Sequence, residues 1–300
     1  MTRHIATAVA GLLTLLLAFA PASAKKRKEL KVYISADMEG IGGVSTWKVQ
    51  ATSEGREFEK FTRLMTLEVN AAIAGAFDAG ATEVLVADSH GDAQNLDVEL
   101  LDERARLIRA WPRPLGMAQG IDETTAAAIL IGYHAGQDSP AATLAHTILG
   151  DGFKVKLNGT EVPEAGLAAA IAGDFGVPVV FLSGDQTIGE QARRLLGPIE
   201  TVAVKEASGF HAATMLHPEE SRRLIREGVK RGIERRASLQ PYKIAQPVEL
   251  EITFTKTVNA ELAAYLPGVK RLGGDTVRFT AENMTDASKF LEAVTGLNTY

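Results

Sequence analysis

The sequence contains no cysteine. A disulfide framework, a thiolate metal site and a cysteine nucleophile are therefore excluded. The chain also has no block of basic residues beyond its N-terminal region, and its formal net charge is −5. Because nucleic-acid binding depends on clustered positive charge, nucleic acid is not expected as a partner.

Motifs of several common enzyme and nucleotide-binding classes are also missing. No G-x-S-x-G elbow is present, which argues against a serine hydrolase of the α/β type. The chain has no P-loop, and the glycines at 40–43 lack the G-x-G-x-x-G spacing of a dinucleotide-binding turn. The histidines and carboxylates are then the residues that could carry chemistry.

The composition is that of a globular protein with a substantial core, since 46% of the residues are hydrophobic and 23% are charged. A length of 300 residues is enough for one large or two modest domains. Strand and helix patterns alternate up to about residue 205, which predicts an α/β fold with a mixed, mainly parallel sheet flanked by helices. Residues 25–205 are predicted to form this metal-binding catalytic domain, and residues 206–300 a smaller C-terminal α+β domain.

Residues 1–24 have the pattern of a secretory signal peptide. An apolar run covers residues 5–20, and Pro21-Ala22-Ser23-Ala24 ends in an A-x-A pattern, which predicts cleavage after Ala24. The alternative is an uncleaved membrane anchor, but the run is short for a spanning helix, which needs ~20 residues. The mature protein is therefore expected in a bacterial periplasm or outside the cell, with no membrane attachment after cleavage.

The stretch from Leu30 to Gly43 combines a short strand with two carboxylates and a glycine-rich turn. Residues 31–36 alternate as a β-strand does, and residues i and i+2 of a strand lie on one face. If the strand continues to Glu39, the side chains of Asp37 and Glu39 point the same way. Open α/β sheets usually place their sites at the carboxyl ends of strands. The alternative is a solvated acidic turn after an edge strand.

Two histidines lie at the ends of two further predicted strands. His90 follows the apolar residues 83–87, and His134 follows residues 125–131. Because all three strands belong to the same predicted sheet, their ends can converge near the two carboxylates. A single histidine in such a position is more often a packed structural residue. Asp88, two residues before His90, either orients its ring or caps a turn.

Glu164 enters next to this group, after a strong hairpin pattern at 154–162. Its alternative role is that of an acidic residue at a helix N-terminus. Two or more imidazoles and three carboxylates together fit a divalent metal such as zinc, manganese or cobalt. Three carboxylates would not gather in one buried site without a cation. Shared between two ions, such a set supports hydrolysis, because one ion polarises a scissile carbonyl and both activate a bridging water.

Asp185 and Lys205 also lie at or beyond the ends of predicted strands, at 177–182 and 200–205. Both are weaker candidates and are interpreted as structural residues.

Five short motifs give the sequence a resemblance to a known family. They are Ser35-Ala-Asp37-Met-Glu39-Gly40, Asp88-Ser89-His90, Gly132-Tyr133-His134-Ala135, the later His146, and Glu164-Ala-Gly166. In this order they resemble the D-aminopeptidase (DppA) family of dinuclear zinc peptidases, from about residue 30 to the C-terminus. The resemblance implies a two-domain α/β fold and a ring-like homo-oligomer that encloses its active sites.

The resemblance also implies a role for each of these site residues. The five ligands of two zinc ions per subunit correspond to Asp37, which would bridge the ions, Glu39, His90, His134 and Glu164. A catalytic histidine that is not a ligand corresponds to His146, which lies in a predicted strand at 142–149. Its role would be to stabilise the developing oxyanion or to pass a proton to the leaving amine.

We therefore expect an exported metallopeptidase that releases N-terminal D-amino acids, D-Ala in particular, from short peptides by a hydroxide that two zinc ions activate. A second hypothesis retains the metal site but assigns another substrate, as in an L-peptidase or another dinuclear metallo-amidohydrolase. A third is a periplasmic solute-binding protein, which would bind a ligand without turnover. The matched metal ligands favour the first hypothesis over the third.

Overall fold

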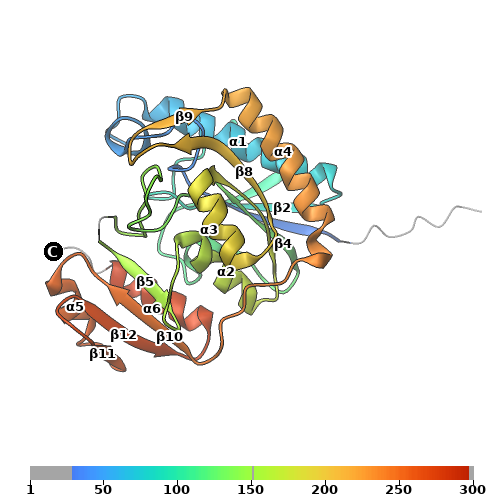
Figure 1. Ribbon diagram of the computed structural model, residues 1–300. Helices are drawn as coiled ribbons and strands as arrows, with labels where there is room; N and C mark the ends of the chain where they lie inside the picture. Colours follow the sequence, from blue (N-terminus) through green and yellow to red (C-terminus); the bar gives the residue numbers. More distant parts are fainter. Residues whose placement is uncertain (1–28, 151, 297–300) are drawn as a thin grey trace, which may run out of the picture.

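The computed structural model describes residues 29–150 and 152–296 of the chain (Figure 1). The predicted signal peptide at 1–24 lies outside the described residues. Within the described ranges, no helix is both long and apolar enough to cross a membrane. The described chain forms two units, each built around its own β-sheet.

The first unit is built on a seven-stranded sheet with the order β3-β2-β1-β4-β7-β8-β9. Its strands are β1 (Lys31–Ala36), β2 (Glu83–Asp88), β3 (Ala105–Ile108), β4 (Thr125–Ile131), β7 (Val179–Asp185), β8 (Glu200–Ala207) and β9 (Ala213–Met215). All neighbouring strands are parallel except β8 and β9. The central strands are nearly continuous apolar runs, which is typical of parallel strands buried on both faces. The prediction of a mixed, mainly parallel sheet is confirmed.

The order of the strands places helices on both faces of this sheet. α1 (Phe58–Asp78) connects β1 to β2, whereas α2 (Glu164–Asp174) and α3 (Gln186–Leu196) lead into β7 and β8. The first connection runs toward one edge of the sheet and the others toward the opposite edge. Because parallel crossovers are almost always right-handed, α1 covers one face, and α2 and α3 cover the other. α4 (Pro218–Glu234) packs beside α1 (Figure 1).

The second unit is built on an antiparallel five-stranded sheet with the order β11-β12-β10-β5-β6. Its elements are β5 (Lys154–Leu157), β6 (Thr160–Glu161), β10 (Val248–Thr253), α5 (Thr257–Ala263), β11 (Val269–Arg271), β12 (Thr276–Ala281) and α6 (Met284–Gly296). The predicted hairpin is present, and it turns at Asn158 and Gly159 with φ angles of 48° and 82°, as a primed turn requires. α6 packs on this sheet and also against α2 of the first unit.

The boundary predicted at residue 205 does not describe this division of the chain. β9 and α4 follow that residue but belong to the first unit, where β9 pairs with β8. The hairpin β5–β6 precedes it but belongs to the second unit, because Leu157 pairs with Leu250 of β10. Strand pairing between distant segments decides which unit each element joins, and local sequence patterns do not reveal such pairing.

Two loops cross closely at the carboxyl edge of the first sheet. The loop after β1 passes the loop after β4, and the N–H of Gly40 donates to the carbonyl oxygen of Gly132 at 2.7 Å. A Cβ atom on Gly40 would lie 2.0 Å from the carbonyl oxygen of Tyr133, and one on Gly132 would lie 2.2 Å from that of Asp37. Glycine at both positions therefore permits the approach that brings the two loops together.

Gly40→Ala is expected to destabilise the protein by about 2 kcal/mol or more. The added methyl group has no room beside a backbone carbonyl, so one of the crossing loops must move. Urea denaturation measures the loss against Gly209→Ala, a control position where a Cβ meets no atom within 4 Å. Equal denaturation midpoints for the two variants would contradict the close crossing.

Glu68 is a buried carboxyl group on α1, beside the loop after β1. Its Oε1 accepts a hydrogen bond from the N–H of Gly42 at 3.0 Å. Burial raises the pKa of Glu68 from 4.5 to about 7, although this hydrogen bond and the charge of Lys205 act in the opposite direction. Between pH 4.5 and about pH 7, the folded protein therefore holds a proton at a site that is mostly ionised in the unfolded chain.

Glu68→Gln is expected to remove a pH dependence of stability. Because the wild-type folded state binds the extra proton, its free energy of unfolding falls as the pH rises from 4.5 to about 7 and then levels off. Between pH 4 and pH 8 the variant should gain up to about 3 kcal/mol relative to the wild type. Urea denaturation of both proteins at these two pH values, with a chelator present, measures the gain. A difference that is the same at both pH values would contradict the burial argument.

Candidate metal centre

The carboxyl edge of the first sheet brings together the six side chains that the sequence predicts for a site. They come from the loops after β1, β2 and β4, from the segment before β5 and from the start of α2: Asp37, Glu39, His90, His134, His146 and Glu164. All six are buried. Parallel strands end at a common edge, which explains how residues far apart in the sequence converge here.

Asp37, Glu39 and His90 form the first of two groups. His90 Nδ1 lies 2.9 Å from Glu39 Oε2 and 3.3 Å from Asp37 Oδ1. The other ring nitrogen, Nε2, donates to the carbonyl oxygen of Ala51 at 2.7 Å, since a carbonyl oxygen can only accept. β1 ends at Ala36, so the two carboxylates converge through the turn rather than through a continued strand.

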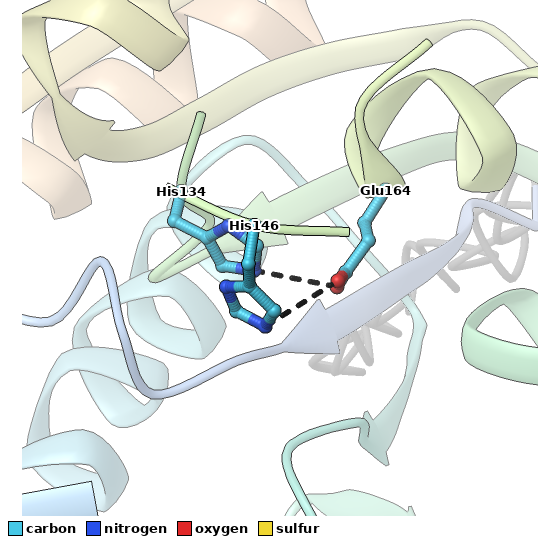
Figure 2. Close-up of side chains that lie close together, drawn as sticks. All are labelled: His134, His146 and Glu164. Carbon is cyan, nitrogen blue, oxygen red and sulfur yellow. Dashed lines mark ion pairs between the residues drawn. The ribbon is translucent and has the colours of Figure 1, made fainter. Parts of the chain in front are cut away.

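The second group shares Asp37 and adds His134 and Glu164. His134 Nε2 lies 3.3 Å from Asp37 Oδ2 and 3.4 Å from Glu164 Oε2. Its Nδ1 donates to the carbonyl oxygen of Ala135 at 3.0 Å, and Figure 2 shows the opposite side of the ring directed at Glu164. Asp37 therefore faces a different histidine with each of its carboxylate oxygens and links the two groups.

His146 lies against the second group. Its ring stacks on that of His134 with the ring centroids 3.9 Å apart. Its Nε2 lies 3.7 Å from Glu164 Oε1 (Figure 2) and 4.0 Å from Glu39 Oε1, and its Nδ1 donates to the carbonyl oxygen of Leu144 at 2.8 Å. These distances to the carboxylates exceed those of the other two histidines, so His146 lies at the margin of the cluster.

Burial and charge compete in setting the protonation of this cluster. Burial lowers the pKa of His90 and of His134, but the neighbouring carboxylates outweigh it and raise both pKa values well above the usual range. Burial also raises the pKa of Asp37, and the charge of Glu39 adds to this effect. At Glu39 itself, burial is outweighed by the histidines, above all His90, and the pKa is lowered. A buried cluster of this kind needs positive charge, which either protonated imidazoles or a bound cation can supply.

The donor atoms fit a divalent cation. Each histidine has one nitrogen fixed on a backbone carbonyl, so the second nitrogen of a neutral ring directs its lone pair at carboxylate oxygens. Asp37 Oδ2 and His134 Nε2 are buried without a hydrogen-bond partner, although they lie only 3.3 Å apart. A cation between such atoms satisfies both, and mixed imidazole and carboxylate ligands suit zinc, manganese or cobalt.

Two sets of three side chains place their ligand atoms within 4.8 Å of one another. One set is Asp37, Glu39 and His90, and the other is His134, His146 and Glu164. The second set includes His146, which the sequence predicts to be catalytic and not a ligand. Metal content after substitution of His146 therefore distinguishes its two possible roles.

Sequence reasoning missed Trp47, which contacts two of the predicted site residues. Its Nε1 donates to Glu39 Oε1 at 2.7 Å, and its ring makes an edge contact with His146 at a centroid distance of 5.2 Å. Trp47 begins a short π-helix that ends at Ala51, whose carbonyl oxygen holds His90. Such helical turns are rare and frequently occur at functional sites. The sequence offers one signal for Trp47: it is one of only two tryptophans in the chain, and it lies shortly after the glycine-rich turn.

Trp47→Phe is expected to lower kcat by about 10- to 100-fold, as is typical when a partner that orients a metal ligand is removed. Phenylalanine retains an aromatic ring beside His146 but removes the donor to Glu39. Steady-state kinetics and a chelator competition for zinc measure the change. Wild-type kcat together with wild-type zinc affinity would contradict an orienting role.

The sequence leaves two roles open for Asp88, and in the structure it caps a turn and makes no hydrogen bond with the His90 ring. Its carboxylate accepts hydrogen bonds from the N–H groups of Asn95 and Leu96, at 2.6 Å and 2.7 Å, and from Asn95 Nδ2 at 2.9 Å. Asn95 Nδ2 also donates to the carbonyl oxygen of His90. Asp88 therefore organises the loop that carries His90, while Ala51 orients the imidazole ring.

The strand predicted at 142–149 is absent, and His146 lies in an irregular loop. Ala141, Leu144 and Ile148 have φ angles of 48°, 53° and 52°, a conformation that non-glycine residues rarely adopt. Contacts with other segments hold the loop: the N–H of Leu144 donates to the carbonyl oxygen of Phe210, and that of Ile148 donates to Glu164 Oε1. These tertiary contacts override the local β pattern.

A cavity of about 380 Å³ opens onto the cluster and has walls from both units. Its lining includes the side chains of Asp37, Glu39, His90, His146 and Glu164. The lining also includes Trp111 and Met117 from the first unit and Glu292 and Thr295 of α6 from the second. The C-terminal region therefore shapes the space in which a ligand would lie.

Comparisons with known proteins agree with the resemblance to the D-aminopeptidase family. A family model described as D-aminopeptidase matches residues 30–293. A D-aminopeptidase of Bacillus subtilis (strain 168) is 34% identical over 269 residues, which cover 89% of this chain and 97% of the relative. A solved structure, described as the Zn-dependent D-aminopeptidase DppA from Bacillus subtilis, a self-compartmentalizing protease, is similar with a TM-score of 0.86 at 34% identity, covering 89% of this chain and 97% of that one.

Proposed function

This chain belongs to the D-aminopeptidase family, and on that basis we propose that it is an exported, zinc-dependent aminopeptidase that releases N-terminal D-amino acids from short peptides. The observation that best supports this function is the convergence of three carboxylates and three imidazoles in one buried cluster beside a cavity. D-Alanine is the N-terminal residue that we expect it to release best.

The proposed centre holds two zinc ions per subunit. Asp37, Glu39 and His90 would hold one ion, and His134 and Glu164 would hold the other, with Asp37 as a ligand of both. The two oxygens of Asp37, each facing a different histidine, support this assignment, as does the unpartnered Nε2 of His134. When bound, the ions supply Lewis-acid polarisation of the scissile carbonyl and lower the pKa of a water.

His146 is the residue placed to move the proton of the reaction. Because its Nδ1–H donates to Leu144, its Nε2 is the atom that faces Glu39 and Glu164 at the cavity. At Nε2 the ring can hold a proton and pass it to the leaving amine, or donate a hydrogen bond to the developing oxyanion. Stacking on His134 fixes the plane in which the ring lies.

Two hydrogen bonds orient the glutamate side chains of the cluster. The N–H of Ile148 donates to Glu164 Oε1 at 2.6 Å, and Trp47 Nε1 donates to Glu39 Oε1 at 2.7 Å. In both residues the other oxygen, Oε2, is the one nearest to the histidine of its group. These two hydrogen bonds therefore fix which oxygen each carboxylate presents to its histidine.

The cavity favours a small substrate with a free N-terminus. Three of the four carboxylates in its lining, from Asp37, Glu39 and Glu164, would bind zinc, whereas that of Glu292 is not a proposed ligand and suits the ammonium group at the N-terminus of a peptide. A volume of about 380 Å³ suits a short peptide rather than a folded protein. α6 closes one side of the cavity and would help to keep bulk water from the reacting groups.

Export and assembly are further parts of the proposal. The signal-peptide pattern of residues 1–24 supports export to the periplasm or the exterior. The relative described as a self-compartmentalizing protease supports a ring-like homo-oligomer for this chain as well.

Matched dipeptides test the proposed activity directly. Residues 25–300 are assayed with zinc for release of alanine from D-Ala and L-Ala dipeptides that share a second residue. Faster release from the D-peptides is the expected result. Release from the L-peptides alone would favour an L-peptidase, and a bound ligand without turnover would favour a solute-binding protein.

A further inference from the structure

Lys205 is buried directly beneath the loop that carries Glu39. Its side chain is 1% exposed, and among the described residues it is the only buried lysine. Its Nζ donates to the carbonyl oxygens of Glu39, Ile41 and Val44, the last two at 3.2 Å and 2.6 Å. All three donors of the ammonium group are therefore used on one loop.

The sheet determines where this ammonium group lies. Lys205 is on β8 in register with Asp185 of β7, near the same carboxyl edge that holds the cluster. Asp185, Glu68, Glu39 and Asp37 all attract its positive charge. Lys205 thus offsets part of the negative charge of the cluster without facing any of its carboxylate oxygens at hydrogen-bond distance.

The loop above Lys205 contains Gly40, Gly42 and Gly43. The N–H of Gly42 donates to Glu68, and the carbonyl oxygen of Gly43 accepts from Gln50 Nε2 at 3.1 Å. Three other carbonyl groups of the loop converge on Lys205. Glycine-rich backbone has many alternative conformations, so a fixed cation is what selects the one that places the Glu39 carboxylate beside His90.

We propose that Lys205 is a positioning residue that sets the loop of residues 39–44 and thereby the place of Glu39 in the metal group of Asp37, Glu39 and His90. The inference rests on the proposed function, since it concerns the same zinc centre. It limits the main effect to the zinc ion that Glu39 would hold. The side chains of His134 and Glu164 are fixed by hydrogen bonds with Ala135 and Ile148, which lie outside this loop.

Zinc titration of the metal-free protein separates this role from a general structural one. Wild type and Lys205→Met are titrated with zinc in competition with a chelator, and both are then assayed. We expect one zinc equivalent of the variant to be weakened about 10- to 100-fold while the other keeps its wild-type affinity. kcat should fall by a similar factor, whereas KM should change by less than about threefold. Lys270→Met, at an exposed position on β11, is the control and should match the wild type.

Chemical rescue tests whether the missing cation is the cause. Lys205→Ala removes the side chain beyond Cβ, and n-propylammonium has the size and charge of the removed part. Addition of this amine should restore zinc affinity and kcat at least partly, whereas n-propanol should not. The proposal is overturned if the zinc affinities of Lys205→Ala already equal those of the wild type and neither compound changes them.

Each remaining outcome also decides the question. If Lys205→Met does not fold, the titration is made on Lys205→Gln, which has a polar end but no positive charge, and two wild-type zinc affinities there overturn the proposal. If neither variant folds, Lys205 has a general structural role and the proposal is wrong. A wild type that binds no zinc contradicts the proposed function, whereas identical binding of two equivalents by wild type and Lys205→Met contradicts only the role of Lys205.

Discussion

Asp37→Asn is expected to lose both zinc ions and to reduce turnover by about a thousandfold or more. Asp37 is the side chain that faces both groups, with Oδ1 lying 3.3 Å from His90 Nδ1 and Oδ2 lying 3.3 Å from His134 Nε2. Asparagine has nearly the same shape but is neutral and has a single oxygen. One of the two positions would then meet an amide N–H₂ group, which cannot bind a cation.

Zinc per chain, measured after dialysis, checks this expectation together with activity on a D-alanyl dipeptide. Asp92→Asn is the matched control, because Asp92 is exposed in the loop that carries His90 and lies outside the cluster. It should bind zinc and turn over substrate as the wild type does. Two zinc ions on Asp37→Asn would contradict a bridging carboxylate.

His146→Ala is expected to keep its zinc and to lose turnover by about 10²- to 10⁴-fold, the usual contribution of general acid–base catalysis. The expectation follows from its position: its Nε2 lies 3.7 Å and 4.0 Å from the nearest carboxylate oxygens, farther than those of His90 and His134. KM should change little, because the substitution removes a proton-carrying group that acts in the transition state.

The zinc content of His146→Ala gives the decisive outcome. If zinc is lost together with activity, His146 is a ligand of the second group, in which its nitrogen lies close enough to take part. His217→Asn is a suitable control. His217 caps α4 through its Nδ1, and asparagine can also cap a helix, so both zinc and turnover should be retained.

The parts of the fold that sequence patterns predict are those decided by local chemistry. The apolar runs of β1, β2 and β4 are buried on both faces, so their composition alone indicates parallel strands. The hairpin at Asn158-Gly159 is equally local, because its backbone requires positive φ angles. Strand ends in a parallel sheet then place the predicted carboxylates and histidines at a common edge.

The parts that sequence patterns do not predict depend on contacts between distant segments. The hairpin β5–β6 joins the second sheet through β10, and nothing within the hairpin indicates this partner. The loop of His146 resembles a strand locally, but the hydrogen bonds that its N–H groups donate to Phe210 and Glu164 hold it in an irregular form. Trp47 was missed and Lys205 was interpreted only as a structural residue for the same reason, since their contacts with the Glu39 loop exist only once the chain has folded.

The zinc stoichiometry of the chain tests the central claim most directly. Residues 25–300 are loaded with zinc, freed of excess metal and examined by native mass spectrometry, which gives the number of ions per chain. The geometry of two groups that share Asp37 predicts two ions per subunit. One ion or none on a folded chain would contradict a dinuclear centre.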